Sequence, residues 1–390
     1  MTRPIAIVSG AVANKCGNGG EAWIRLSWTL GLKRLGFDVC FVEQIPQSSC
    51  VDASGSEISF AASANLAWFQ AVMNRFGLAN SCALIYENGQ EVWGLGLDEL
   101  IRRAGSAELL VNISGHLILD SIKQLPRCKV FVDEDPGFTQ MWQANRTAGA
   151  HLDGHDFYFT LGQNIGTSDC AIPTVGILWR HIHSPIVLDQ WPLCGRNSFD
   201  RFTTVASWRG AYGPVQYGGK TYGVKAHEFR KLFELPRRSG KKFEIALHID
   251  PADKKDLDAL HCHGWRILDP REVADSPDAF RQYVQNSSAE FSVAQGMYVD
   301  TNSGWFSDRT VRYLASGRPA LVQDTGFTHQ LPVGQGLLAF QTLDEAVEQA
   351  GRLVDDYEKH CWAARQLAEE YFDSDKVIRR VVAITGVSVK

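Results

Sequence analysis

Near the start of the chain, hydrophobic residues alternate between two patterns. Residues 5–9 form a short, nearly continuous apolar run, which predicts a strand buried on both faces. From about Glu21 to Leu35, apolar side chains recur every three or four positions, as in an amphipathic helix, and Gly36 ends the pattern. Another apolar run covers residues 39–42. Strand, loop, helix and strand in this order predict a βαβ unit with two parallel strands.

The same alternation continues along the chain and predicts two α/β halves. In the first half, further strands are expected at residues 109–113, 130–133 and 157–160. In the second half, strands are expected at residues 202–206, 243–249, 289–293, 319–322 and 337–340. Residues 174–200 show neither the spacing of a helix, with apolar residues every three or four positions, nor that of a strand, and they contain prolines. They are therefore interpreted as the connection between the halves. One final amphipathic helix is expected from about Thr342 to Tyr371.

Two open parallel sheets also predict where a ligand binds. Ligands of such sheets lie outside the carboxyl ends of the strands. Where two sheets face each other, the cleft between them is the first candidate site. Functional residues are therefore expected in the loops that follow the strands.

Composition narrows the class of protein. The chain has 390 residues, with 39 basic and 44 acidic side chains, and a net charge of −5 argues against a broad nucleic-acid surface. No apolar run approaches the ~20 residues of a transmembrane helix, and the first one is too short for a secretory signal. Nine scattered cysteines without a C-x-x-C pair are typical of reduced thiols. We expect a cytoplasmic protein without a nucleic-acid partner.

The sequence holds one metal-like cluster, at residues 261–263, which read His-Cys-His. Further ligands at zinc spacing are lacking around it, so a bound structural metal is not expected.

The most informative segment covers residues 302–319. It predicts a loop, an N-cap at Ser307, a helix to Ser316, a C-cap at Gly317 and then a strand. Unpaired N–H groups at a helix N-terminus suit a phosphate or diphosphate, and the small Gly304 allows its close approach. An ordinary capped helix would give the same pattern.

This segment resembles a known family. Residues 307–322, which read SDRTVRYLASGRPALV, are similar to the nucleotide-sugar segment of GT-B glycosyltransferases, and more narrowly of the group-1 and CgeB-like members. The tail at residues 343–372 resembles their C-terminal helices.

The resemblance implies a fold and assigns a separate binding role to each domain. The fold would be GT-B, with two Rossmann-like domains facing across a cleft and a C-terminal helix that crosses back. The domains would be residues 1–195 for the acceptor, residues 196–370 for the nucleotide-sugar donor, and residues 371–390 for the returning helix. The reaction would need no metal and no cofactor, and the acceptor would be a small molecule, a glycan or another hydroxyl compound.

One departure from the family pattern concerns the ribose contact. Retaining members carry two glutamates eight positions apart, where this chain has Gly304 and Arg312. Asp308 is the nearest carboxylate that could replace the second one.

Cations are expected opposite the diphosphate, because the leaving group gains negative charge as the glycosidic bond breaks. The resemblance points to Arg209, to one of Lys220 or Lys225, and to Arg309, whose guanidinium suits a phosphate. The alternative is that these are ordinary solvated cations. By the same resemblance, residues 261–267 occupy the place of a base-recognition loop.

In the first half, three loops carry the remaining candidates. The glycine turn with Gly19 and Gly20 resembles the loop that approaches the donor phosphate or the acceptor. His116 follows a strand, where family members often carry a histidine near the transferred sugar. Asp133 or Asp135 is the candidate base for the acceptor hydroxyl, although a turn with capping acids would look similar.

Three other functions stay open. A nucleotide-sugar epimerase uses the same two domains, and a non-catalytic nucleotide- or glycan-binding protein would explain the missing glutamates. A nicotinamide dehydrogenase is the weakest alternative, since the glycine loop is not G-x-G-x-x-G. It is kept only because Glu43 lies near the spacing of a ribose-binding acid.

Overall fold

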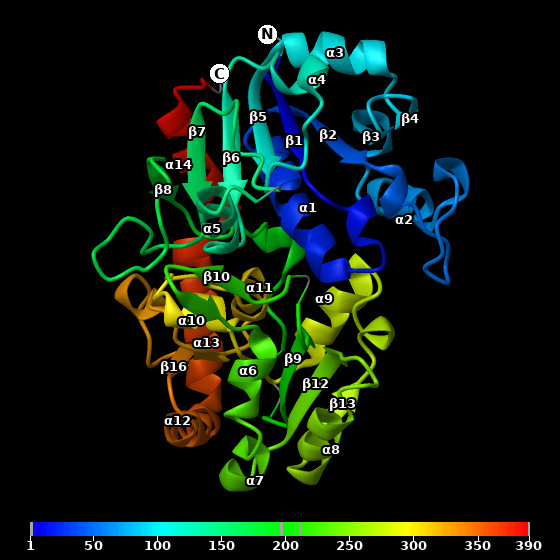
Figure 1. Cartoon of the computed structure of the whole chain (residues 1–390). Coiled ribbons are helices and arrows are strands. Elements are labelled where there is room, and N and C mark those ends of the chain that lie inside the picture. Colours follow the sequence, from blue (N-terminus) through cyan, green and yellow to red (C-terminus); the bar gives the residue numbers. More distant parts are fainter. Residues whose placement is uncertain (1–2, 148, 196–197, 211, 389–390) are drawn as a thin grey trace.

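The strands are continuous apolar runs that need cover on both faces, and they assemble into two separate sheets (Figure 1). The computed structural model describes residues 3–147, 149–195, 198–210 and 212–388. The first lobe lies above the second in this view, and the chain termini lie together at the far end of the first lobe (Figure 1).

The first lobe contains an eight-stranded sheet in the order β4-β3-β2-β1-β5-β6-β7-β8. All neighbours are parallel except β3 and β4. The strands are β1 (Ile5–Ser9), β2 (Asp38–Ile45), β3 (Cys82–Tyr86), β4 (Glu91–Gly94), β5 (Ala107–Ile113), β6 (Lys129–Asp133), β7 (Phe157–Thr160) and β8 (Trp179–His181).

The second lobe contains a six-stranded parallel sheet in the order β13-β12-β9-β14-β15-β16. A two-stranded hairpin stands apart from this sheet. The strands are β9 (Phe202–Ser207), β10 (Val215–Tyr217), β11 (Lys220–Tyr222), β12 (Phe243–His248), β13 (Trp265–Leu268), β14 (Ala289–Ser292), β15 (Ala320–Gln323) and β16 (Leu337–Phe340).

All strands expected from apolar runs are confirmed to within two or three residues at their ends. The strands that were not predicted lie at or near sheet edges. One of them, β8, falls inside the predicted connection at residues 174–200, which is therefore not wholly irregular. It has only three residues and a single neighbour, so its sequence needs no continuous apolar run.

Helices cover both sheets. The first lobe has α1 (Gly19–Arg34), α2 (Ala64–Arg75), α3 (Leu97–Gly105), α4 (Asp120–Lys123) and α5 (Phe138–Ala144). The second lobe has α6 (Lys225–Arg230), α7 (Leu235–Ser239), α8 (Lys254–Cys262), α9 (Pro277–Asn286), α10 (Gly296–Asp300), α11 (Asp308–Ala315), α12 (Leu343–Asp355) and α13 (Tyr357–Leu367). The last helix is α14 (Ser374–Thr385). None of the helices in the described part of the chain is both long and apolar enough to cross a membrane.

The prediction of a single helix from Thr342 to Tyr371 is wrong. The helix breaks at Asp356, whose φ of −117° and ψ of 35° leave the helical region. Before the break α12 packs against α7 and β16, and after it α13 packs against α11. The amphipathic pattern continues through the break because both helices have a buried face.

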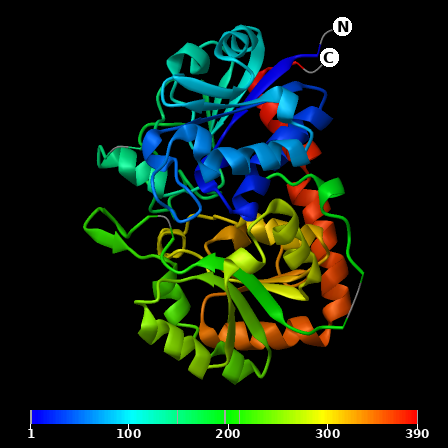
Figure 2. The same cartoon turned by 90° about the vertical axis from the view of Figure 1, so that its right-hand side faces the viewer.

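The C-terminal segment returns to the first lobe, as the resemblance implies (Figures 1 and 2). Ser374 N–H donates to the Ile186 carbonyl at 2.8 Å, and α14 then packs along α1. Arg34 on α1 pairs with Asp375 at 3.1 Å. The predicted domain limits at residues 195, 370 and 390 stay predictions, and residues 196–197 and 389–390 lie outside the described residues.

The two lobes share one hydrophobic cluster. Trp23 on α1 lies 5.1 Å from Trp191, ring centre to ring centre, and Phe280 on α9 belongs to the same cluster. The Trp23 indole N–H donates to the Pro277 carbonyl at 2.8 Å. Dry packing therefore holds one end of the interface between the lobes.

The close packing of α14 on α1 can be tested at Gly31. A Cβ at this position would lie 2.4 Å from Ile378 Cδ1, so Gly31→Leu is expected to lower the free energy of unfolding by about 1–3 kcal/mol. Urea denaturation measures the change. Gly105→Leu, at a site where no side chain and no backbone beyond its own helix turn and chain neighbours lies within 4 Å of the added Cβ, is the matched control. Equal stability of the two variants would contradict this packing.

Candidate functional site

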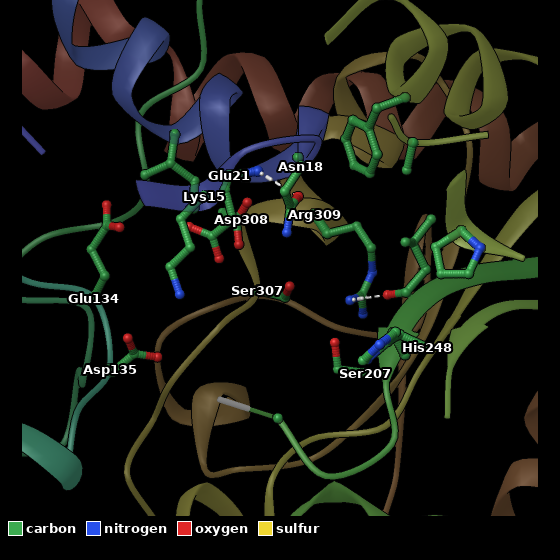
Figure 3. A pocket seen from close by; sticks show the side chains of 18 of the residues that line it. Lys15, Asn18, Glu21, Glu134, Asp135, Ser207, His248, Ser307, Asp308 and Arg309 are labelled. Atoms are coloured by element: carbon green, nitrogen blue, oxygen red, sulfur yellow. Dashed lines mark hydrogen bonds between the residues drawn. The ribbon is translucent and has the colours of Figure 1, made fainter. Parts of the chain in front are cut away.

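A cavity of about 590 Å³ lies between the lobes, where the carboxyl ends of strands from both sheets meet. The first lobe contributes the loops after β1, β5 and β6 and the start of α1. The second lobe contributes the ends of β9 and β12 and the starts of α6 and α11. Figure 3 shows the polar side chains that point into this space: Lys15, Asn18, Glu21, Glu134, Asp135, Ser207, His248, Ser307, Asp308 and Arg309.

The loop after β1 is held by a buried carboxylate. Glu43 on β2 accepts the backbone N–H groups of Val12, Ala13 and Asn14 at 2.8, 2.7 and 2.8 Å. Burial raises the pKa of Glu43 to about 7, although these donors oppose the shift. Because its side chain is fully buried under the loop, Glu43 is not available to a ribose hydroxyl. The only sequence feature that favoured a nicotinamide dehydrogenase, the position of Glu43, therefore no longer supports that function.

The two predicted glycines lie in different environments. Gly19 donates its N–H to the Ala274 carbonyl at 2.8 Å, and a Cβ there would lie 2.0 Å from the Ser276 carbonyl oxygen. It is therefore a contact between the lobes. Gly20 lines the cavity. Asn18 caps α1 by accepting the Glu21 N–H at 3.1 Å.

The acids after β6 also separate. Asp133 is fully buried and accepts hydrogen bonds from Thr139, Gln140 and Thr160 at 2.9, 2.7 and 2.7 Å. Its carboxylate is thus occupied away from the cavity. Glu134 and Asp135 line the cavity, and burial raises the pKa of Glu134 to about 8 and that of Asp135 to about 6.

A buried arginine beneath the first-lobe loops was not predicted. Arg25 on α1 is 4% exposed, forms an ion pair with Glu21 and lies 3.8 Å from Glu134. Burial disfavours its charge, but the two carboxylates raise the pKa of Arg25 above its usual value. The sequence feature that could have identified Arg25 is its spacing from Glu21, since the two opposite charges lie four residues apart within an otherwise apolar helix.

His116 lines the cavity beside this pair. The loop before it turns through left-handed backbone, with φ of 52° at Ser114 and 67° at Gly115. Burial and the nearby charges of Arg25 and Lys15 lower the pKa of His116 to about 3. The imidazole is therefore neutral at physiological pH.

In the second lobe, the start of α11 faces the cavity as predicted. Ser307 is the N-cap residue, and its side chain makes no capping hydrogen bond. Asp308 lines the cavity and pairs with Arg312. Gly304 lies outside the cavity lining, because its left-handed backbone packs against the first lobe, where a Cβ would be 3.0 Å from Asn164.

Arg309 lines the cavity, but other groups hold its guanidinium. It donates to Glu290 at 2.6 Å, to the Val205 carbonyl at 2.8 Å and to Ser292 at 2.8 Å. The buried Glu290 balances its charge, so Arg309 is a fixed polar part of the cavity wall and not a free cation.

Of the other three predicted cations, one lines the cavity and two lie outside its lining. Lys225 lines the cavity, and within the described chain no hydrogen bond or ion pair involves its Nζ atom. Burial, and then Arg309, lower the pKa of Lys225 to about 7. Lys220 is exposed on the hairpin outside the cavity lining. Arg209 is 63% exposed and pairs with Asp253, also outside the lining.

The segment at residues 261–267 is not a cleft loop. It covers the end of α8 and most of the edge strand β13. The cavity instead meets His248 and Arg271, which lie before and after these elements. Among the residues that the structure describes, no group of three or more His, Cys, Asp or Glu side chains could hold a metal ion.

No known protein-family profile and no curated protein matches this chain. Solved structures do match over nearly the whole length. An alpha-glucosyltransferase in complex with UDP and DNA is 10% identical, with a TM-score of 0.59 over 98% of this chain and 99% of that chain. HepE from Anabaena in complex with UDP-glucose is 11% identical, with a TM-score of 0.58 over 99% and 100%. Sucrose-phosphate synthase from Thermosynechococcus elongatus is 11% identical, with a TM-score of 0.56 over 98% of both chains.

This chain has the GT-B fold. In the GT-B cleft most of the acids lie on the first lobe, where Glu21, Glu134 and Asp135 accompany Lys15 and Arg25. The second lobe contributes Lys225, Arg271 and Arg309 together with Asp308. Of the predicted site residues, the fold brings seven together at the cavity: Gly20, His116, Asp135, Lys225, Ser307, Asp308 and Arg309. It places five elsewhere: Gly19, Asp133, Arg209, Lys220 and Gly304.

The role of Glu43 in shaping this GT-B cleft can be tested. Glu43→Gln is expected to lower the free energy of unfolding by about 1–3 kcal/mol, because an amide nitrogen cannot accept a backbone N–H. Urea denaturation and hydrogen exchange at residues 12–14 measure the effect. Glu91→Gln, at an exposed position on β4, is the control. Unchanged exchange at residues 12–14 would contradict this role.

Proposed function

We propose that the protein is a glycosyltransferase that binds a nucleotide sugar against its second lobe and transfers the sugar to a hydroxyl group held by the first. The observation that carries the proposal is the cleft itself. Across one cavity, a helix N-terminus and the half-buried Lys225, unpaired within the described chain, face two carboxylates. The matched GT-B structures in complex with UDP and UDP-glucose support a nucleotide-sugar donor.

In this proposal the diphosphate lies at the start of α11. Free N–H groups there favour an anion, and the Ser307 hydroxyl is available to donate a hydrogen bond. Lys225 approaches from the start of α6 and supplies the positive charge, whereas the charge of the nearby Arg309 is balanced by Glu290. These groups stabilise the charge that appears on the diphosphate as the sugar–oxygen bond breaks. We therefore expect turnover without a divalent metal.

The acceptor lies on the opposite side of the cavity, where Asp135 acts as the base. Tyr298 O–H donates to Asp135 Oδ1 at 2.9 Å, which fixes the carboxylate and leaves its other oxygen for the acceptor. As the new bond to the sugar forms, the hydroxyl proton passes to Asp135. Asp133, the other candidate, has its carboxylate occupied by three side-chain donors.

A donor panel tests the function. The protein is incubated with UDP-, GDP- and TDP-sugars in buffer containing EDTA, and thermal stability and slow donor hydrolysis are followed. We expect stabilisation by at least one nucleotide and slow release of its sugar. No response to any donor, or an isomerised sugar nucleotide as the sole product, would contradict the proposal.

The lowered pKa of Lys225 predicts a pH dependence. Below pH 7 the free lysine is charged, whereas above pH 7 an anion must bind together with a proton. The affinity for the responding nucleotide sugar should therefore fall about thirtyfold from about pH 6 to about pH 8.5. Calorimetry measures this slope.

Two variants distinguish which of the two candidate lysines binds the diphosphate. Lys225→Met should bind the donor weakly at low pH and lose most of the slope. Lys220→Met, on the exposed hairpin, should keep both the affinity and the slope. The opposite result would assign the diphosphate to Lys220.

Substitution of Asp135 should affect turnover, whereas substitution of Asp133 should affect stability. Asp135→Asn is expected to lower kcat by about 10²–10⁴-fold while donor affinity is retained, because only proton transfer is lost. Asp133→Asn should instead lower the free energy of unfolding, since its carboxylate accepts three buried hydrogen bonds. Full turnover in Asp135→Asn would remove it as the base.

A further inference from the structure

We propose that the acceptor carries a protonated amine, as amino sugars and amino cyclitols do, and that Glu134 binds this ammonium group. This inference rests on the proposed function, because it names the acceptor of the same cleft. It needs an acidic, partly aromatic surface on which Glu134 has no hydrogen-bond donor from the described chain and only one cation, Arg25, at 3.8 Å.

Glu134 is the central observation. Its side chain is 9% exposed and lines the cavity (Figure 3). Within the described chain, its carboxylate takes part in no hydrogen bond. Its one ion-pair neighbour there is Arg25, at 3.8 Å, beyond hydrogen-bond reach. A buried carboxylate without a donor is costly, so this position is suited to a bound group that donates.

The surrounding charges do not provide that donor. Arg25 forms its close ion pair with Glu21, and Asp308 pairs with Arg312. Lys15 extends into the cavity, but among the described residues it forms no ion pair with any of these acids. Asp135 adds a further carboxylate beside Glu134. The acids on this side therefore outnumber the cations that reach them.

Aromatic rings line the same part of the cavity. Trp305 donates its indole N–H to the Glu134 carbonyl at 3.3 Å and stacks on Tyr298, with ring centres 4.3 Å apart. Tyr212 also lines the cavity. Aromatic faces attract cations and pack against the C–H groups of sugar rings. A carboxylate beside such rings matches an amine on a carbohydrate frame better than a neutral sugar.

The acid–amine contact also predicts proton release. Burial raises the pKa of Glu134 to about 8, so the carboxyl group is largely protonated in the free cleft at neutral pH. An ammonium in contact with it favours the ionised form. Binding should therefore release about one proton per amine bound at about pH 7.

The test compares matched probes on the full chain saturated with UDP. Di-glucosamine is compared with diacetylchitobiose, and neamine with its fully N-acetylated form, because acetylation removes the charge and keeps the carbohydrate frame; the salt dependence separates the loss of charge from the added bulk of the acetyl group. We expect the amines to bind about tenfold or more tightly than their acetylated forms at low salt, with the difference shrinking as salt is added. Calorimetry in two buffers of different ionisation enthalpy measures affinity and proton release together.

Variants assign the effect to Glu134. Glu134→Gln should abolish both the amine preference and the proton release, while UDP affinity is retained. Glu348→Gln, an exposed carboxylate on α12, is the matched control and should behave as the unaltered chain. The comparison of the probes needs no variant, so it stands even if Glu134→Gln fails to fold.

The outcomes separate the two proposals. Equal binding of amine and acetylated probes, no binding of any amine at millimolar concentration, or a preference that survives in Glu134→Gln would overturn the amine acceptor while UDP binding keeps the proposed function. Failure of every nucleotide to bind would overturn both.

Discussion

The contact between α1 and the second lobe is the constraint on which the cleft depends. The Trp23 indole is packed among Phe76, Trp191 and the α9 region, and its N–H is satisfied by the Pro277 carbonyl. Gly19, at the start of the same helix, touches the second-lobe backbone so closely that a Cβ could not fit. Close packing of this kind holds interfaces in discrete arrangements. The separation of the two loop sets is therefore fixed at this end of the cleft.

This fixed geometry determines which charged groups lie on each side of the cavity. Strand ends of the second lobe bring Lys225 and the start of α11 to one side, and strand ends of the first lobe bring Glu134 and Asp135 to the other. Each group is partly removed from water, which strengthens its interaction with a ligand. A diphosphate and a nucleophilic acceptor can thus be held in one cavity without exchanging places.

The departures from the glycosyltransferase pattern have structural explanations. Arg312, which replaces the expected glutamate, is a buried residue of α11, pairs with Asp308 and lies over the Trp191 ring at 5.9 Å. Gly304 turns the chain against Asn164 of the first lobe. Both positions therefore belong to the interface between the lobes.

The sequence by itself determined two sheets of mainly parallel strands, the capped helix at Ser307 and the return of the C-terminal segment. These features depend on local hydrophobic period, on capping residues and on a motif that is contiguous in the chain. Only the tertiary structure decided which cations and acids share the cleft. Lys220 and Lys225 are five positions apart, yet one lies on an exposed hairpin and the other inside the cavity. Asp133 and Glu134 are adjacent, but successive side chains at a strand end point in different directions, so one is saturated by buried donors and the other faces the ligand space. Burial and partners of this kind come from residues distant in the chain, which is why local patterns do not contain them.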